Sequence, residues 1–385
     1  MIDLYISSGI IELMVFISIR SCLYMLIIWR LYMDEIFTSG TFNDLNLSDH
    51  FFDSLKNDYP GFDAWFLRKT NDNTPVFYCK SSNNKILAML YLKNETEEIQ
   101  LNTQYLGPKK RKKIGTLKLD ESLRNTRLGE GAIGIALWSW MNEGLDEIYV
   151  TIYEKHKKLV SLFEKFGFLI KGKNSNGELV MLKDKNNLSY DTPYKSFPYI
   201  NPNSKKFGMI PIVDFYHDTL FPYSKLQRNF MEDLRLSASN GITKTFLGFP
   251  RGNTKLEEGE CVFIYRIHSG ENKYYNSVIS SYCTISKIEM FYPKEQSFYE
   301  FKKLVKNRTV FTDEKLLDFY KTRYRIMIID LVYNGYFGSG NNVNYDYLNK
   351  NGLFEVYPYN IEYTYDDAKK IFQRGRVNVP NLIID

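Results

Sequence analysis

The sequence predicts an α/β (α+β) protein in two parts, a mixed helix-and-strand part followed by a mostly β part. From residue 33 to about residue 182, helix-like and strand-like segments alternate. Residues 184–206 then hold three prolines among Asn, Ser and Lys, which is typical of a linker, and strand-like segments dominate beyond it. We therefore expect four divisions: an extension at 1–32, a first domain at 33–184, a linker at 185–206 and a second domain at 207–385.

The composition is that of a globular protein, with 44% hydrophobic and 25% charged residues in 385. Fifty Lys and Arg against 45 Asp and Glu give a net charge of +5, which permits nucleic-acid binding without requiring it. The four cysteines form no CxxC pair, and three sit among strand-like residues. We expect buried free thiols in a reducing, cytoplasmic compartment. With only four histidines, the chain predicts no metal site.

Capping and turn residues divide the first part into its elements. Asp49 can cap a helix that begins near Phe51, and Tyr59-Pro60-Gly61 separates this helix from the next. The other elements follow from apolar periodicity. We expect strands at 76–79, 86–92, 114–119, 147–152 and 179–182, and helices at 129–142 and 155–166.

The second part is predicted to be a compact β domain, because runs of β-branched and aromatic residues recur between turn signals. A helix is expected only at 297–305, and a Gly- and Asn-rich loop at 335–344. The expected strands lie at 245–247, 261–265, 277–287 and 324–333.

Residues 10–29 are almost wholly apolar and long enough to cross a bilayer. Arg20 interrupts the run, at an insertion cost of about 2.5–3.5 kcal/mol. The segment fits a membrane anchor, a packed or self-associating helix, or an extension upstream of the natural start. We favour the last, because the chain reads as soluble protein from Met33 onward.

Residues 114–130 predict a phosphate-binding joint between a strand and a helix. The strand ends at Leu119, a polar loop follows, and a helix opens near Gly129. Such a loop points successive backbone N–H groups at one spot, where the helix dipole adds partial positive charge. Arg124 and Arg127 could reinforce a bound pyrophosphate. The alternative is a tight turn with two solvated arginines.

This stretch resembles the acyl-CoA-binding motif of the GNAT N-acetyltransferase superfamily, Arg/Gln-x-x-Gly-x-Gly/Ala. Arg124 matches the first position and Gly129 the last, while Arg127 replaces the central glycine. A rival register, Thr126-x-x-Gly129-x-Gly131, keeps both small residues but loses the leading arginine. We prefer the first register, because the family's fourth strand then ends at Leu119. The resemblance extends over about residues 34–182.

The resemblance implies a GNAT-type mixed twisted sheet flanked by helices, with acetyl-CoA as co-substrate between its splayed fourth and fifth strands. The backbone of Leu117 and Leu119 would pair with the pantetheine arm. We expect residues 33–184 to bind acetyl-CoA by themselves. The residues expected to hold the pyrophosphate are Arg124, Asn125, Thr126, Arg127, Leu128, Gly129 and Glu130.

The catalytic groups follow the family pattern less closely. Aligned on Gly167-Phe168, the position of the usual tyrosine is Phe163, which has no proton to give to a departing thiolate. Tyr153 is then the candidate acid, Glu154 the candidate base, and His156 a third candidate at the usual asparagine position. Glu154 fits equally a solvated loop charge, and His156 a helix N-terminal residue.

The run Lys109-Lys-Arg-Lys-Lys113 places five positive charges before the cofactor strand. It fits a solvated hairpin edge, a contact with the 3′-phosphate of CoA, or a contact with a polyanionic acceptor such as RNA.

The second part resembles a PUA-like domain of the ASCH/EVE kind, on His217-Asp218, Asn240-Gly241 and the strand after Gly259-Glu260. This resemblance implies a small pseudo-barrel beside a cleft for RNA or a modified base. Basic residues near aromatic ones suit single-stranded nucleic acid. The nucleic-acid-binding candidates are Lys244, Arg251 and Arg266. A half-buried strand with solvated lysines is the alternative.

These observations predict an acetyl-CoA-dependent N-acyltransferase that acts on an amine, with RNA or aminoacyl-tRNA as one expected acceptor. Two alternatives remain open. One is a non-catalytic module that binds CoA and nucleic acid; this alternative stays open because Phe163 has no proton to give. The other is an N-acetyltransferase for protein or small amines, with the second part as a scaffold.

Deletion of residues 1–32 is expected to leave a folded protein that binds acetyl-CoA, because every domain signal begins after Met33. Thermal melting and calorimetry of the truncated chain test this. Aggregation of that chain would contradict the expectation.

Overall fold

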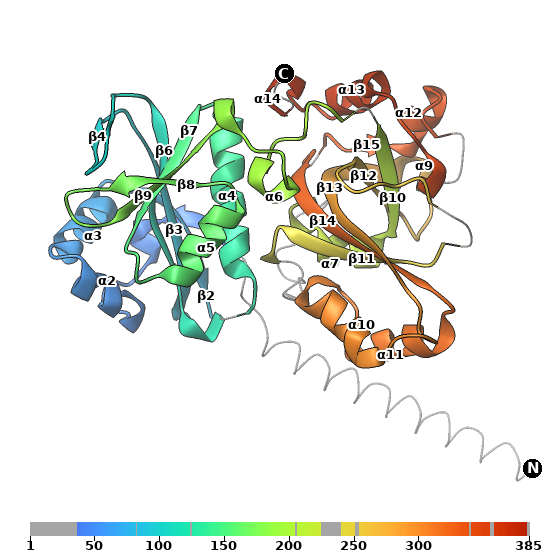
Figure 1. Ribbon diagram of the computed structural model, residues 1–385, viewed down its shortest axis with the longest axis horizontal. Helices are drawn as coiled ribbons and strands as arrows, with labels where there is room; N and C mark the ends of the chain where they lie inside the picture. The colour runs from blue at the N-terminus through green and yellow to red at the C-terminus, as the bar shows by residue number, and fades with distance from the viewer. Residues whose placement is uncertain are drawn as a thin grey trace, which may run out of the picture.

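The computed structural model describes residues 37–81, 83–123, 125–204, 206–224, 240–250, 254–338, 340–354 and 358–382. These residues form two halves that lie side by side, each built on its own sheet (Figure 1). Within these ranges no helix combines the length and the apolar character that crossing a bilayer requires. The apolar segment at 10–29 lies outside the described residues.

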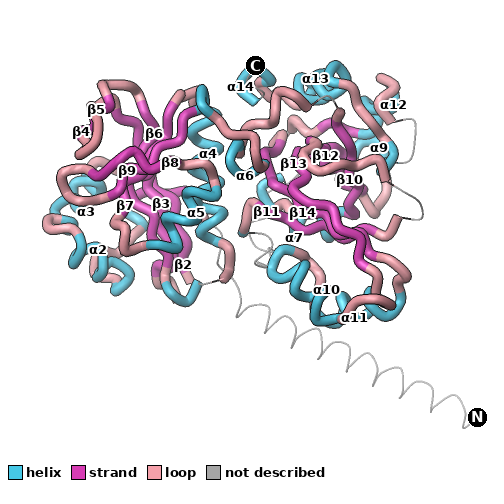
Figure 2. The backbone as a smooth tube through the Cα atoms, in the orientation of Figure 1, coloured by secondary structure: helices cyan, strands magenta, loops and turns pink. Residues whose placement is uncertain are grey.

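The first half is a seven-stranded mixed sheet with the order β1-β2-β3-β6-β7-β9-β8 (Figure 2). The pair β6–β7 is parallel, and every other neighbouring pair is antiparallel. The strands are β1 (Thr38–Thr41), β2 (Pro75–Lys80), β3 (Ile86–Glu95), β6 (Arg111–Leu119), β7 (Glu147–Ile152), β8 (Leu169–Lys173) and β9 (Leu179–Asp184), with a separate hairpin of β4 (Ile99–Gln100) and β5 (Tyr105–Leu106).

Helices cover both faces of this sheet, because successive residues of its strands point to opposite sides. On β3, Met89 packs with the helices α2 (Asp53–Asp58) and α3 (Phe62–Asn71), whereas Leu90 packs with α4 (Leu128–Asn142). The remaining helix is α5 (Lys157–Lys165). The predicted mixed sheet flanked by helices is therefore confirmed.

The second half contains a sheet in the order β10-β12-β13-β14-β11, with β15 paired to β13. Among the described strands the path has two ends, so the sheet is open and not a closed barrel. Cys261 and Cys283 of this half are buried free thiols, as is Cys79 of the first half, which confirms the prediction for these three residues. The strands are β10 (Phe207–Val213), β11 (Thr243–Gly248), β12 (Cys261–Ile267), β13 (Val278–Phe291), β14 (Ile326–Tyr336) and β15 (Val343–Asn344).

Helices surround the second sheet, and α10 and α11 lie together at one end of it (Figure 1). α10 begins with a capping box between Ser297 and Glu300, which satisfies its first backbone N–H groups. The helices are α6 (Pro193–Ser196), α7 (Asp214–Leu220), α9 (Lys273–Asn276), α10 (Phe298–Val305), α11 (Asp313–Thr322), α12 (Tyr345–Lys350), α13 (Tyr365–Arg374) and α14 (Val379–Leu382). Short 3₁₀ turns are η1 (Phe42–Asp44), η2 (His50–Phe52), η3 (Glu121–Leu123), η4 (Lys185–Asn187), η5 (Pro222–Ser224), η6 (Lys306–Arg308) and η7 (Pro358–Asn360).

The two halves share one hydrophobic core, which passes through α4. This helix is apolar on nearly all sides because one face packs on the first sheet and another on the second half. A Cβ on Gly131 would lie 2.2 Å from the backbone oxygen of Asn240, and one on Gly134 would lie 2.2 Å from the side chain of Ile242. At position 131 only glycine allows this close approach, because the contacted atom belongs to the backbone, whereas at position 134 the side chain of Ile242 would have to move.

Candidate active site

The sheet of the first half opens between β6 and β7. The two strands pair only from Arg111 with Glu147 to Ile114 with Val150. Beyond these pairs β6 follows β3 to Leu119, and β7 follows β9 to Ile152. A cavity of about 1250 Å³ occupies the opening and continues along α2, α3 and α5. The backbone groups of Leu117 and Leu119 thus line a cleft.

A β-bulge marks the point where the strands separate. Tyr91 pairs with Thr116 and Leu92 with Ile114, so Gly115 is the extra residue on β6. A Cβ on Gly115 would lie 2.7 Å from the ring of Tyr91, so a larger residue would displace that ring. Bulges disrupt the ladder and re-aim backbone groups. Gly115 lines the cleft, so a backbone N–H group that the bulge leaves out of the ladder can hold a carbonyl oxygen there.

The loop after β6 is tightly fixed. Asp120 accepts hydrogen bonds from the N–H (2.9 Å) and hydroxyl (2.6 Å) of Ser122, and these bonds lower the pKa of its carboxyl group. Thr126 donates from its N–H and its hydroxyl to the carbonyl of Leu123. Asn125 (φ 70°) and Arg127 (φ 64°) adopt the left-handed conformation, which is uncommon for residues other than glycine.

α4 begins directly after this loop, at Leu128, and its first turn packs against Leu119, a residue that lines the cleft. The N–H of Gly131 bonds to the carbonyl of Arg127, so the N–H groups of the preceding three residues have no partner within the helix. A Cβ on Gly129 would lie 3.1 Å from Leu119 of β6 and 3.6 Å from Leu162 of α5. Gly129 therefore keeps open the passage between strand and helix. Together, these features form a cradle for a pyrophosphate.

The other predicted loop residues take different places. Arg124 lies outside the described residues. The side chain of Glu130 turns away from the cleft and accepts hydrogen bonds from the N–H (3.1 Å) and the hydroxyl (2.6 Å) of Thr243 in the second half. Arg127 and Lys165 pair with the same carboxylate. Although burial alone would raise the pKa of Glu130, these partners lower it.

The three catalytic candidates from the sequence are not brought together at the bulge. Glu154 is exposed, and its carboxylate lies 2.9 Å from the ammonium of Lys173, outside the residues that line the cleft. Tyr153 packs its ring 5.6 Å from that of Tyr59. His156 does line the cleft, as the residue that precedes α5. Phe163 is fully buried against Phe168.

Two cleft residues that the sequence did not single out form a hydrogen-bonded acid–base pair. Tyr59 donates its hydroxyl to Glu178 (3.0 Å), and Asn174 donates to the other carboxylate oxygen (2.9 Å). Glu178 is only 5% exposed yet lines the cleft. Burial, and then the charge of Glu178, raise the pKa of Tyr59, so its hydroxyl stays protonated. In the sequence, Tyr59 was interpreted only as part of the break between two helices, and Glu178 was not singled out.

The basic run is not the solvated edge that the sequence allowed. Arg111, at the start of β6, is 4% exposed and pairs with Glu147, and Lys109 pairs with the same carboxylate at 3.0 Å. Lys112 pairs with Glu143. Each of these three cations thus pairs with an acidic side chain of a neighbouring element, and these pairs neutralise much of the positive charge of the run.

The nucleic-acid candidates of the second half do not build a basic surface. Lys244 of β11 is fully buried, 5.7 Å from the ring of Tyr333, and burial lowers its pKa well below the ordinary value. Arg266 of β12 is 9% exposed and bonds to both carboxylate oxygens of Asp218 (2.8 and 2.9 Å). Arg251 lies outside the described residues.

Comparison with known proteins returns similarity to solved structures, each to one part of the chain. No protein-family model and no curated protein matches this sequence. A mutant form of an ASCH protein from Zymomonas mobilis has 8% identity and a TM-score of 0.30, over 44% of this chain and 96% of its own. Ard1 from Thermoplasma volcanium has 10% identity and a TM-score of 0.30, over 39% and 96%. Arabidopsis thaliana NAA60, solved with a bisubstrate analogue, has 11% identity and a TM-score of 0.29, over 38% of this chain and 95% of its own.

The similar solved structures also include acetyltransferases of the GNAT family.

Proposed function

We propose that this protein is an acetyl-CoA-dependent N-acetyltransferase that acts on an amine. The observation that carries the proposal is the opening between β6 and β7, whose lining runs from the Gly115 bulge to Asp120 and Glu121, at the start of the loop that leads to α4. Gly129 supplies the test of fit, because a larger side chain there would press on Leu119, which lines the cleft that the pantetheine arm would occupy. When bound, acetyl-CoA supplies the acetyl group as a thioester.

The chain's own residues then position the reactants and move a proton. The backbone at the bulge can donate hydrogen bonds to the carbonyl oxygen as negative charge develops on it. Glu178 can accept the proton that the attacking amine loses as its nitrogen bonds to the carbonyl carbon and the carbon–sulfur bond breaks. The Tyr59 hydroxyl can donate a proton toward the departing sulfur, a role that Phe163 cannot fill.

The acceptor end of the cleft is polar and charged, as an amine substrate requires. Lys113 lies 3.6 Å from Glu95, and burial lowers its pKa. Glu95 is 9% exposed and also pairs with Lys93. An amine carried on RNA or aminoacyl-tRNA is a narrower form of this proposal.

The test is transfer of label from radioactive acetyl-CoA to separate fractions of peptides, polyamines and total RNA, with the full chain as enzyme. Label in one fraction supports the proposal and names the acceptor. Binding of acetyl-CoA without transfer to any fraction would instead support the non-catalytic module, and absence of binding would overturn both.

Replacement of Glu178 by Gln is expected to lower kcat about 100-fold with little change in acetyl-CoA affinity, because it removes a base and not a binding group. Steady-state kinetics and calorimetry measure the two quantities. Glu154→Gln is the matched comparison, since that carboxylate lies outside the cleft lining. Loss of activity in Glu154→Gln alone would restore the candidate that the sequence favoured.

A further inference from the structure

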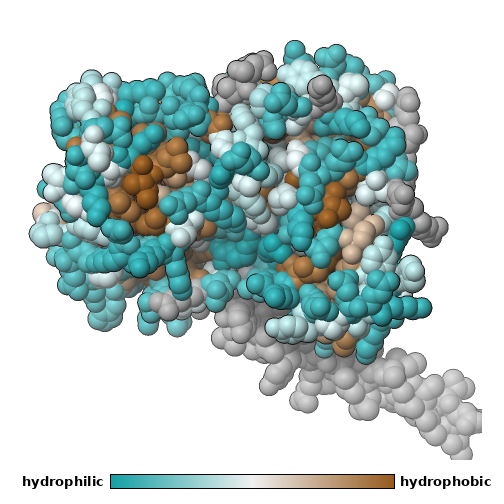
Figure 3. Space-filling view, in the orientation of Figure 1, coloured by the Kyte–Doolittle hydropathy of each residue, from teal (hydrophilic) through white to brown (hydrophobic). Residues whose placement is uncertain are grey.

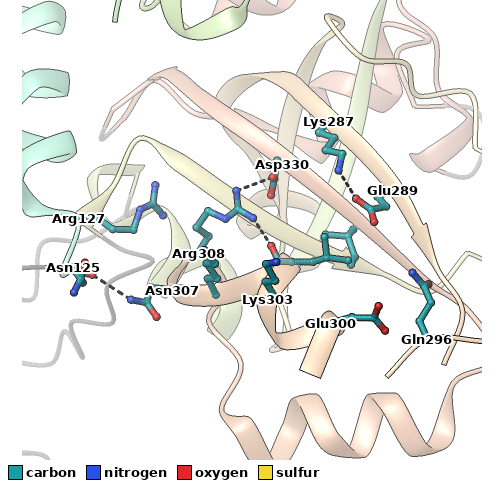
Figure 4. A pocket seen from close by; sticks show the side chains of 13 residues that line it. Asn125, Arg127, Lys287, Glu289, Gln296, Glu300, Lys303, Asn307, Arg308 and Asp330 are labelled. Carbon is teal, nitrogen blue, oxygen red and sulfur yellow. Dashed lines mark hydrogen bonds and ion pairs between the residues drawn. The ribbon is translucent and has the colours of Figure 1, made fainter. Parts of the chain in front are cut away.

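A second cavity, of about 760 Å³, lies at the seam between the two halves (Figure 4). The first half contributes Asn125 and Arg127 from the loop that precedes α4, and the second half contributes α10, η6 and the strands β13 and β14. The surface between the halves is mainly hydrophilic in Figure 3. Five cationic side chains and three acidic ones line the cavity: Arg127, Lys287, Lys303, Lys306 and Arg308 against Glu289, Glu300 and Asp330.

The acidic residues do not neutralise this cavity. Arg308 lies at its centre and pairs with Asp330 at 2.8 Å, and Lys287 pairs with Glu289 (Figure 4). Lys303 and Lys306 are exposed and have no ion-pair partner among the described residues. The excess positive charge therefore sits at the end of α10 and in η6.

The backbone at the end of α10, where these lysines lie, has an unusual conformation. Lys306 has φ 38°, an unusual value for a residue other than glycine, at the point where α10 gives way to η6. Asn307, the next residue, donates from its side chain to the carbonyl of Asn125 (3.2 Å). The second half thus holds the loop of the first half directly.

Two of the arginines that line the cavity also carry unused hydrogen-bond donors. Nη1 of Arg127 and Nε of Arg308 are buried with no hydrogen-bond partner among the described residues. A buried donor without an acceptor is unfavourable, because it has lost its hydrogen bonds to water. The excess positive charge and the unused hydrogen-bond donors together indicate that the cavity favours a bound anion.

We propose that this cavity binds the 3′-phosphorylated adenosine end of acetyl-CoA, so that the second half completes the co-substrate site. This inference rests on the proposed function. The loop residues that wall the cavity belong to the segment whose helical end forms the pyrophosphate cradle. A group attached to that pyrophosphate would therefore lie next to the loop that walls the cavity.

Two other assignments fit the geometry less well. The basic run starts β6 at Arg111, eight residues from Leu119, which places it roughly 26 Å from the cradle. It also has acidic partners of its own. A nucleic-acid acceptor must deliver its amine near Gly115, whereas this cavity adjoins the loop beyond Leu119, at the end of the strand.

The experiment compares acetyl-CoA with 3′-dephospho-acetyl-CoA by calorimetry on the full chain. Wild-type protein is expected to bind acetyl-CoA about 10-fold more tightly than the dephospho form, and the double variant Lys303→Ala/Lys306→Ala to lose that preference. The preference should shrink in high salt, because both lysines are exposed. The control is Lys315→Ala/Lys321→Ala in α11, which removes two charges outside the cavity lining and should retain the preference.

The outcomes separate this inference from the proposed function. Equal affinity of the wild type for both co-substrates, with the double variant unchanged, would overturn the inference and leave the acetyltransferase proposal standing. Loss of affinity for a single-stranded oligoribonucleotide in the double variant, with acetyl-CoA affinity intact, would assign the cavity to nucleic acid and overturn it as well. Failure of the wild type to bind either co-substrate would overturn both proposals.

Discussion

A Gly129→Val variant is expected to bind acetyl-CoA at least about 100-fold more weakly than the wild type, because two charge-assisted bonds to the pyrophosphate are each worth about 1.5–3 kcal/mol. The valine side chain would enter the gap between Leu119 and Leu162, where even a Cβ lies 3.1 Å from the first of them. It would thus narrow the passage to the first turn of α4. Calorimetry with the full chain measures the effect.

The fold should survive this change, because the contacted atoms are the ends of flexible leucine side chains. Gly129→Ala should therefore have a smaller effect on binding. Gly107→Val is the control, since a Cβ there meets only Tyr105 at 3.8 Å, away from the loop. Unchanged acetyl-CoA affinity in Gly129→Val would show that the cradle is assigned wrongly.

Replacing Glu130 with alanine is expected to lower the free energy of unfolding by about 3–5 kcal/mol, the usual cost of removing one partner from a buried ion pair. Arg127 and Lys165 would lose their shared carboxylate, and Thr243 would lose the acceptor of two hydrogen bonds. Urea denaturation followed by tryptophan fluorescence measures the loss. Glu130→Gln, which keeps an oxygen for Thr243, should lose less.

The effect of Glu130→Ala should depend on pH in one direction. The pKa of this carboxyl group is lowered from 4.5 in the folded protein, so its stabilisation is present above pH 4.5 and is lost as the pH falls through the folded value. The stability difference between wild type and Glu130→Ala should therefore narrow in acid. A difference that is constant or grows in acid would contradict the role of the charged form.

The helices and strands that could be predicted from the sequence are those marked by the pattern of neighbouring residues. The loop after β6, the helix that follows and the strands β7, β12 and β13 could be predicted because periodicity, glycine and polar loop residues mark them. The strand β10 was not among the predicted elements. The sheet places β10 at an edge, where it pairs with β12 and where Phe207 forms a single bridge with Tyr363, and Pro211 is tolerated in such an edge strand.

The candidate site was harder to predict, because its side chains come from distant segments. Tyr59 and Glu178 are 119 residues apart and meet only through the fold. Lys244 was expected at the surface because alternate residues of a half-buried strand face solvent, but it is fully buried beside the rings of Phe221 and Tyr333. Burial of this kind depends on how the two halves pack, which no short segment encodes.

The close approach of α4 to the second half has a consequence for how the protein unfolds. Since Gly131 and Gly134 leave no room for a side chain at Asn240 and Ile242, separation of the halves would expose the apolar face of α4 to water. Heating should therefore produce a single cooperative calorimetric transition. By the same reasoning residues 33–184 expressed alone should aggregate, contrary to the expectation from the sequence, and should regain a stable fold when co-expressed with the remainder of the chain.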